Sequence, residues 1–225
     1  MIFFVGSLEN STLNLKLRIV GVFRKITRVS YGIMAWHINI DRLRRYCSPE
    51  GELTLAAIEK HHAAALNAYD RNGLSDIPIR HIIQDLLNGE CHHLDIGFQY
   101  GYALKILCHF CGDMLANNRV YPLAMDSFDA IDRAWAKIGL NDILRMSRLV
   151  YGGSPIQLPV INDFPTIGYL TAAECELANN RLFDDRGIPQ FDLTSPNFPI
   201  PILNQIASWI SIAAEMQQGI ICFYH

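Results

Sequence analysis

The sequence is short of charge. Asp, Glu, Lys and Arg make up 18% of its 225 residues, whereas about a quarter is typical of globular proteins. The net charge of −3 argues against a general affinity for nucleic acid. Residues 1–47 carry eight Lys and Arg against two acids, and this basic end either packs beside acidic helices or forms a nucleic-acid arm. No groove-reading motif accompanies it, so we expect no nucleic-acid partner.

The familiar signatures of enzymes are also missing. The sequence has no P-loop, no dinucleotide-binding glycine fingerprint, no nucleophile elbow and no HExxH zinc-protease motif. This removes the enzyme classes that a sequence identifies most readily. No motif for a cofactor is present, and we predict none.

The chain shows neither a targeting signal nor a membrane span. The apolar opening Met1–Val5 is too short for a signal peptide, and no basic residue precedes it. No charge occurs between residues 192 and 215, but prolines interrupt this stretch. Its helical part, about residues 200–214, is shorter than the ~20 residues that a span requires. We therefore expect a buried helix with Trp209 in the core, no membrane contact and a cytoplasmic location.

Disulfides are not expected. Half of the residues are apolar, which is enough to build a sizeable core without covalent staples. The cysteines lie in apolar or helical surroundings, and we expect reduced thiols. They are Cys47, Cys91, Cys108, Cys111, Cys175 and Cys222.

What the sequence does contain is a helical pattern with strands near its ends. Apolar residues alternate along 13–20 and 33–40, and Ile220–Tyr224 is a β-branched and aromatic run. We predict an α+β fold, mostly helical, with a small antiparallel sheet formed by N-terminal and C-terminal strands. Ile220–Tyr224 should pair with the strand at 33–40, because either would be marginal alone. Caps and spacing predict helices at 41–47, 49–71, 76–87, 96–111, 126–138, 141–151, 171–181 and 200–217.

One candidate metal site is built on a CxxC pair. Zinc bound by Cys108 and Cys111 could recruit Cys91 or a neighbouring histidine, because cysteine and histidine are its preferred ligands. The alternative is that both are small apolar residues of a buried helix. The C-terminus of a helix disfavours thiolates, and no second CxxC follows. We therefore predict no metal site. If a metal did bind, Cys91, Cys108 and Cys111 would be its candidate ligands.

The candidate catalytic residues are His92, His93 and Asp95. Histidine and aspartate can act as general acids and bases, so these residues could form a hydrolase site together with the helix that carries Cys108 and Cys111. No local motif specifies such a site.

Four segments resemble an uncharacterised bacterial domain-of-unknown-function family. They are Ser30-Tyr31-Gly32-Ile33-Met34-Ala35-Trp36, Phe98-Gln99-Tyr100-Gly101-Tyr102-Ala103, Asn162-Asp163-Phe164-Pro165-Thr166-Ile167-Gly168 and Cys222-Phe223-Tyr224-His225. The resemblance covers roughly residues 30–225 and implies a compact cytosolic protein. It implies no activity and carries over no catalytic residue.

The resemblance also bears on the domain limits. We expect a single globular domain over residues 29–225. A GTG start codon at Val29 would give a chain that opens as the family does. With that start, residues 1–28 would be sequence upstream of the true start. The alternative is that residues 1–28 are a genuine extension with a strand of its own.

Two classes of function remain. The preferred hypothesis is a non-enzymatic cytosolic interaction protein, such as an accessory or immunity-type partner of another protein. The alternative is an enzyme with an unfamiliar His/Asp/Cys site. A deep polar pocket with convergent His and Asp side chains would favour the enzyme, and an exposed apolar patch would favour the interaction protein.

Overall fold

The computed structural model describes residues 31–71, 76–184, 186 and 200–225. They belong to a compact unit that spans Tyr31–His225. The strand predicted at 13–20 and the question of residues 1–28 lie outside the described residues.

The centre of this unit is a four-stranded antiparallel sheet with strand order β2-β1-β4-β3. β1 (Ile33–Ile38) pairs with β4 (Gly219–Tyr224), which confirms the predicted pairing of the N-terminal and C-terminal strands. β3 (Thr166–Leu170) pairs with the other side of β4, and the two-residue β2 (Asp113–Met114) pairs with β1. The sequence pattern did not predict these last two strands.

Both faces of the sheet are buried. Ala35 of β1 lies opposite Cys222 of β4, and both face one apolar core. Their neighbours Trp36 and Ile221 also lie opposite each other and face a second core. Because successive strand residues point to opposite faces, a sheet with a core on each side needs strands that are apolar throughout.

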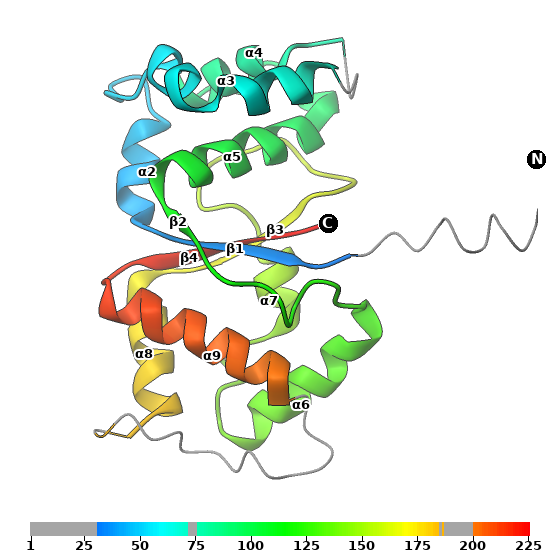
Figure 1. The fold of residues 1–225 in the computed structure, drawn as a ribbon, viewed down its shortest axis with the longest axis vertical. Coiled ribbons are helices and arrows are strands. Elements are labelled where there is room, and N and C mark those ends of the chain that lie inside the picture. Colours follow the sequence, from blue (N-terminus) through cyan, green and yellow to red (C-terminus); the bar gives the residue numbers. More distant parts are fainter. Residues whose placement is uncertain (1–30, 72–75, 185, 187–199) are drawn as a thin grey trace, which may run out of the picture. The chain divides into compact units, whose positions relative to one another are not determined.

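Helices cover the two faces, so the described part of the chain has a helical layer on each side of the sheet (Figure 1). One layer contains α2 (Ile40–Tyr46), α3 (Leu55–Arg71), α4 (Ile79–Leu87) and α5 (Gly97–Cys111), with the 3-10 turn η1 (Leu94–Ile96) before α5. The other contains η2 (Met125–Ser127), α6 (Phe128–Lys137), α7 (Met146–Tyr151), α8 (Ala172–Leu182) and α9 (Ile200–Glu215). The predicted α+β class with mostly helical content is confirmed.

Helix α3 begins later than the sequence predicts. The helix predicted at 49–71 would place Ser48 at its N-cap. Instead the Ser48 hydroxyl donates to the carbonyl of Arg45, and the N–H of Gly51 donates to the Ser48 carbonyl, both at 2.8 Å. These contacts make a turn, and α3 starts only after Thr54, whose hydroxyl accepts from the N–H of Ala57 at 3.3 Å.

Helix α7 is also shorter than predicted. It starts at Met146 rather than after Asn141. The carboxylate of Asp132, on α6, accepts from the N–H of Met146 at 2.6 Å. The cap is therefore supplied by a neighbouring helix, and helix spacing within 141–151 cannot reveal it.

Two other helices follow the sequence pattern closely. Thr171 and Glu174 form the predicted capping box of α8. The uncharged helix α9 is a core helix, with Ile206, Trp209 and Ile210 at most 1% exposed. Among the described residues, no helix is long and apolar enough to cross a membrane.

Candidate functional site

The three candidate catalytic residues lie between α4 and α5. His92 is exposed, and its Nε2 lies 2.8 Å from a carboxylate oxygen of Glu90. The backbone N–H of His93 donates to the hydroxyl of Tyr100 at 3.2 Å. Asp95 is exposed on η1. No hydrogen bond within the described residues joins the side chains of His92, His93 and Asp95.

Helix α5 keeps these residues away from the CxxC pair. They precede its first turn, whereas Cys108 and Cys111 lie in its last turn. A 15-residue helix is about 22 Å long. The structure therefore does not bring the two halves of the hypothetical hydrolase site together. Cys91 also precedes α5, and its thiol contacts the carbonyl of Gln157 at 3.7 Å.

At the far end of α5, Cys108 is buried, and Cys111 and the nearby Cys47 are partly buried. Burial raises the pKa of Cys111 to about 11 and that of Cys47, at the end of α2, to about 12. Burial also holds the pKa of Cys108 well above its usual value. Thiols that stay protonated at neutral pH are poor nucleophiles and poor metal ligands. All six cysteines are free, and no group of His, Cys, Asp or Glu in the described ranges could hold a metal ion.

A small pocket opens where the end of α3 and the start of α4 meet α5. We call it the α5 pocket, and its volume is about 100 Å³. The Gln99 side chain in its lining is only 5% exposed, and its Oε1 is buried without a hydrogen-bond partner in the described structure. A buried acceptor without a donor is costly. The lining also includes Tyr69, Asp70, Asp76, Ile77 and Tyr102.

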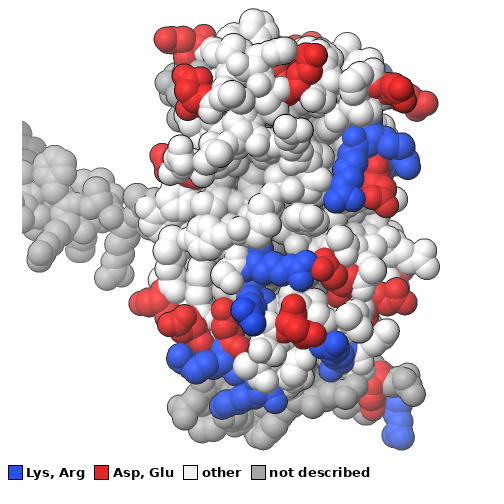
Figure 2. All heavy atoms as spheres, turned by 180° about the vertical axis from the view of Figure 1, so that it is seen from behind, with Lys and Arg blue, Asp and Glu red and all other residues white. Residues whose placement is uncertain are grey.

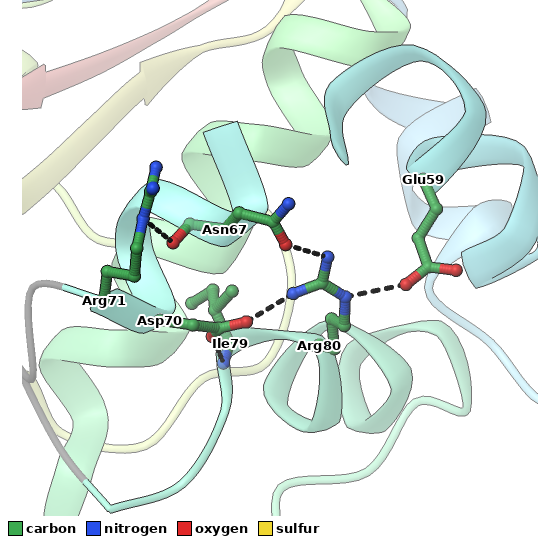
Figure 3. A network of polar contacts seen from close by, with 6 residues as sticks. All are labelled: Glu59, Asn67, Asp70, Arg71, Ile79 and Arg80. Atoms are coloured by element: carbon green, nitrogen blue, oxygen red, sulfur yellow. Dashed lines mark hydrogen bonds and ion pairs between the residues drawn. The ribbon is translucent and has the colours of Figure 1, made fainter. Parts of the chain in front are cut away.

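A polar network around Arg80 holds one wall of this pocket in place (Figure 3). The Arg80 guanidinium donates to Glu59 at 2.7 Å and to Asn67 at 2.8 Å, both on α3, and forms an ion pair with Asp70. The other oxygen of Asp70 accepts from the backbone N–H of Ile79 at 2.8 Å. Asp70 thus joins the end of α3 to the first turn of α4, which positions its carboxylate at the pocket.

Polar residues continue along α5 from the pocket. Gln99, Tyr102 and Lys105 recur every three residues, a spacing that makes them neighbours on one side of a helix. The Nζ of Lys105 lies 3.1 Å from the Nε2 of His225. Burial lowers the pKa of Lys105 to about 8, and burial together with Lys105 lowers the pKa of His225 to about 4. At neutral pH a neutral imidazole therefore accepts a hydrogen bond from the ammonium group.

A second feature is the segment of residues 152–165, which we call the strap. It has no regular secondary structure and leads into β3. The N–H of Gly153 donates to the carbonyl of Ile167 at 2.9 Å. Arg44 of α2 donates to the carbonyl of Pro155 at 3.0 Å. The strap is thus fixed to the edge strand of the sheet and to the helical layer.

The strap has no charged residue over 152–162, and the exposed Asp163 follows this part. Residues 149–162 include no Asp, Glu, Lys, Arg or His. Val160 is 75% and Leu94 is 70% exposed, and the two are near each other because Gly97, shortly after Leu94, packs directly on the carbonyl of Val160. The face seen from behind in Figure 2 has a broad area without charged side chains. A groove of about 460 Å³ lies between the strap and β3, and its apolar lining includes Tyr151, Ile156, Leu158, Pro159, Ile161 and Ile167.

The four segments that carry the family resemblance converge beside these features. The Tyr31 ring lies 4.9 Å from that of Phe164 and 6.0 Å from that of Tyr224, between centroids. A side chain on Gly101 would meet the ring of Pro165. Sequence order alone could not show this convergence. The spacing of Gln99, Tyr102 and Lys105 was visible in the sequence, but the helix was interpreted there only as a buried one.

Comparison with known families agrees with the resemblance. Residues 29–225 match a family described as a domain of unknown function, DUF7691, and the chain belongs to this family. No curated protein and no solved structure matches the chain.

Proposed function

We propose that this DUF7691 protein is a non-enzymatic cytosolic interaction protein, of the accessory or immunity type, that binds a partner protein through the strap groove. The observation that carries the proposal is the exposed apolar surface beside this groove, where Val160 of the strap is 75% exposed and Leu94 of η1 is 70% exposed. Contiguous exposed apolar surface of this kind marks interaction sites, whereas single exposed apolar residues need no explanation.

The groove favours an extended apolar segment of the partner. Its volume of about 460 Å³ is within the range of clefts that hold ligands. Thr166, at the start of the edge strand β3, contributes to its lining, and the Thr166 hydroxyl has no hydrogen-bond partner among the described residues. A backbone N–H of an extended segment could satisfy it while apolar side chains fill the groove.

The hydrolase alternative has less support. No described residue that lines the α5 pocket or the strap groove is a histidine. His92 is paired with Glu90 on the surface, at the other end of α5 from Cys108 and Cys111. Among the candidate residues His92, His93, Asp95, Cys108 and Cys111, the structure places no nucleophile and base within hydrogen-bonding reach of each other.

Site-specific photo-crosslinking tests the proposal. A photoreactive amino acid is placed at Val160 in the native host, and the crosslinked protein is identified by mass spectrometry. Leu177 of α8, an exposed apolar residue away from the strap, serves as the matched control position. Binding of the identified partner is then measured with purified Val160→Asp and Leu177→Asp variants.

We expect a specific crosslink from position 160 and none from position 177. Val160→Asp should abolish binding, because it places a charge on the apolar surface between the lining residues Pro159 and Ile161, and Leu177→Asp should leave binding unchanged. Equal effects of the two substitutions would contradict the proposal. So would crosslinking at position 160 only to a second copy of the chain, since that outcome indicates self-association.

A further inference from the structure

We propose that the α5 pocket is a binding site for a small organic cation that carries several N–H donors, with a guanidinium group as the best fit. The site is separate from the strap groove, so the proposal does not depend on the function proposed above.

The first argument is the unsatisfied amide of Gln99. Nearly all buried polar groups in native proteins have a hydrogen-bond partner, so an exception calls for an explanation. Oε1 of Gln99 has none within the described structure, although the side chain is 5% exposed and contributes to the lining of the pocket. The terminal torsion of a glutamine is soft, so the amide of this lining residue can turn to meet an N–H donor in the pocket.

The second argument is that the lining favours a cation. Among the described residues, it contains the carboxylates of Asp70 and Asp76 and no Lys or Arg. Asp70 is neutralised by Arg80, whereas Asp76 is exposed and has no ion pair with any described residue. The nearest cation along α5, Lys105, is bound to His225.

The third argument is the pair of aromatic rings. The rings of Tyr69 and Tyr102 lie 5.6 Å apart between centroids and are tilted by 48°. Burial raises the pKa of both phenols, so both rings are neutral at physiological pH. Faces of neutral aromatic rings attract cations, and the planar guanidinium also stacks on them.

The size of the pocket limits the ligand. A cavity of roughly 150 Å³ in another protein accommodates benzene, and methylguanidinium is smaller than benzene. The volume of about 100 Å³ therefore suits one guanidinium or ammonium group with a short stem. The rest of a larger ligand would lie outside, past the exposed Asp76.

Ligand titrations followed by NMR test the site. The full chain is titrated with methylguanidinium and with methylurea, its neutral analogue, while the ring signals of Tyr69 and Tyr102 are observed. L-Arginine and a blocked peptide with one arginine then distinguish a free small molecule from a peptide side chain as the source of the group. We expect saturable shifts with methylguanidinium in the millimolar range, as for other small ligands, and none with methylurea.

Two substitutions and one control make the test specific. Gln99→Met should weaken binding at least tenfold and raise the Tm of the unliganded protein, because it removes an unsatisfied buried amide. Asp76→Asn changes an exposed residue and should weaken binding severalfold without affecting folding. Gln84→Met, at an exposed glutamine of α4 outside the pocket, should change neither property.

Three outcomes would overturn the proposal. They are the absence of saturable shifts at Tyr69 and Tyr102, equal binding of methylurea and methylguanidinium, and an equal loss of affinity in Gln84→Met and Gln99→Met. A lower Tm for Gln99→Met would show that the amide has a structural partner and would also contradict it.

Discussion

Two buried tryptophans differ in one hydrogen bond, and this difference predicts different costs for the same substitution. Trp209 and Trp135 are 1% and 0% exposed and belong to the same apolar core. The indole N–H of Trp209 donates to the carbonyl of Ala116 at 2.6 Å. The indole N–H of Trp135 is buried without a partner in the described part of the chain. Replacing either residue with Phe removes a similar volume.

The hydrogen bond sets the expected magnitudes. Trp209→Phe loses a hydrogen bond with a net contribution of about 0.5–1.5 kcal/mol. Ala116 is exposed, so water can replace the donor and the cost should not reach the full desolvation penalty. Trp135→Phe instead removes an unsatisfied donor, which offsets part of the lost packing. We expect Trp209→Phe to lower the free energy of unfolding by about 1–2 kcal/mol more than Trp135→Phe does. Trp209→Ala should cost about 3–5 kcal/mol.

Urea unfolding of the full chain measures these differences, provided that the slope m is the same in all variants. An equal or larger loss of stability in Trp135→Phe would refute the assignment of the hydrogen bond. A Trp209→Ala variant that keeps its stability and loses only partner binding would refute the burial argument, because Trp209 would then be an interface residue.

Three further predictions concern His225, its neighbour Lys105 and the cap of α8. The pKa of His225 is lowered from 6.5 to about 4. As pH falls, the unfolded chain therefore protonates this histidine before the folded chain does, and the free energy of unfolding should fall between pH 6.5 and pH 4. Urea unfolding across this pH range should show a smaller fall for His225→Asn than for the wild-type chain. Lys105→Met removes one cause of the lowered pKa of His225, so NMR titration of this variant should give a His225 pKa nearer to 6.5. An unchanged pKa would contradict the contact between Lys105 and His225. Thr171→Val breaks the capping box with Glu174 and should lower the free energy of unfolding by about 1 kcal/mol. Thr171→Ser keeps the capping hydroxyl and should retain most of the stability that Thr171→Val loses.

The sequence by itself determined the elements whose signals are local. Alternation predicted the strand β1, a β-branched and aromatic run predicted the strand β4, and the need of each for a partner predicted their pairing. The Thr171 and Glu174 pair predicted the start of α8, because a capping box involves residues only three positions apart. The uncharged, proline-interrupted run predicted that α9 is a core helix. These features depend on the spacing of residues along one segment, and that spacing is directly readable.

The tertiary structure alone decided which distant groups meet. The start of α7 depends on Asp132 of another helix, and the strand β3 exists because β4 offers it an edge. The candidate catalytic residues and the CxxC pair are separated by the length of α5, which no motif could indicate. Gln99 is one polar residue in a helix predicted to be buried, and only its packing leaves its Oε1 buried without a donor among the described residues. Contacts between residues far apart in the chain depend on how segments pack in three dimensions, and a single sequence does not carry that information in its local spacing.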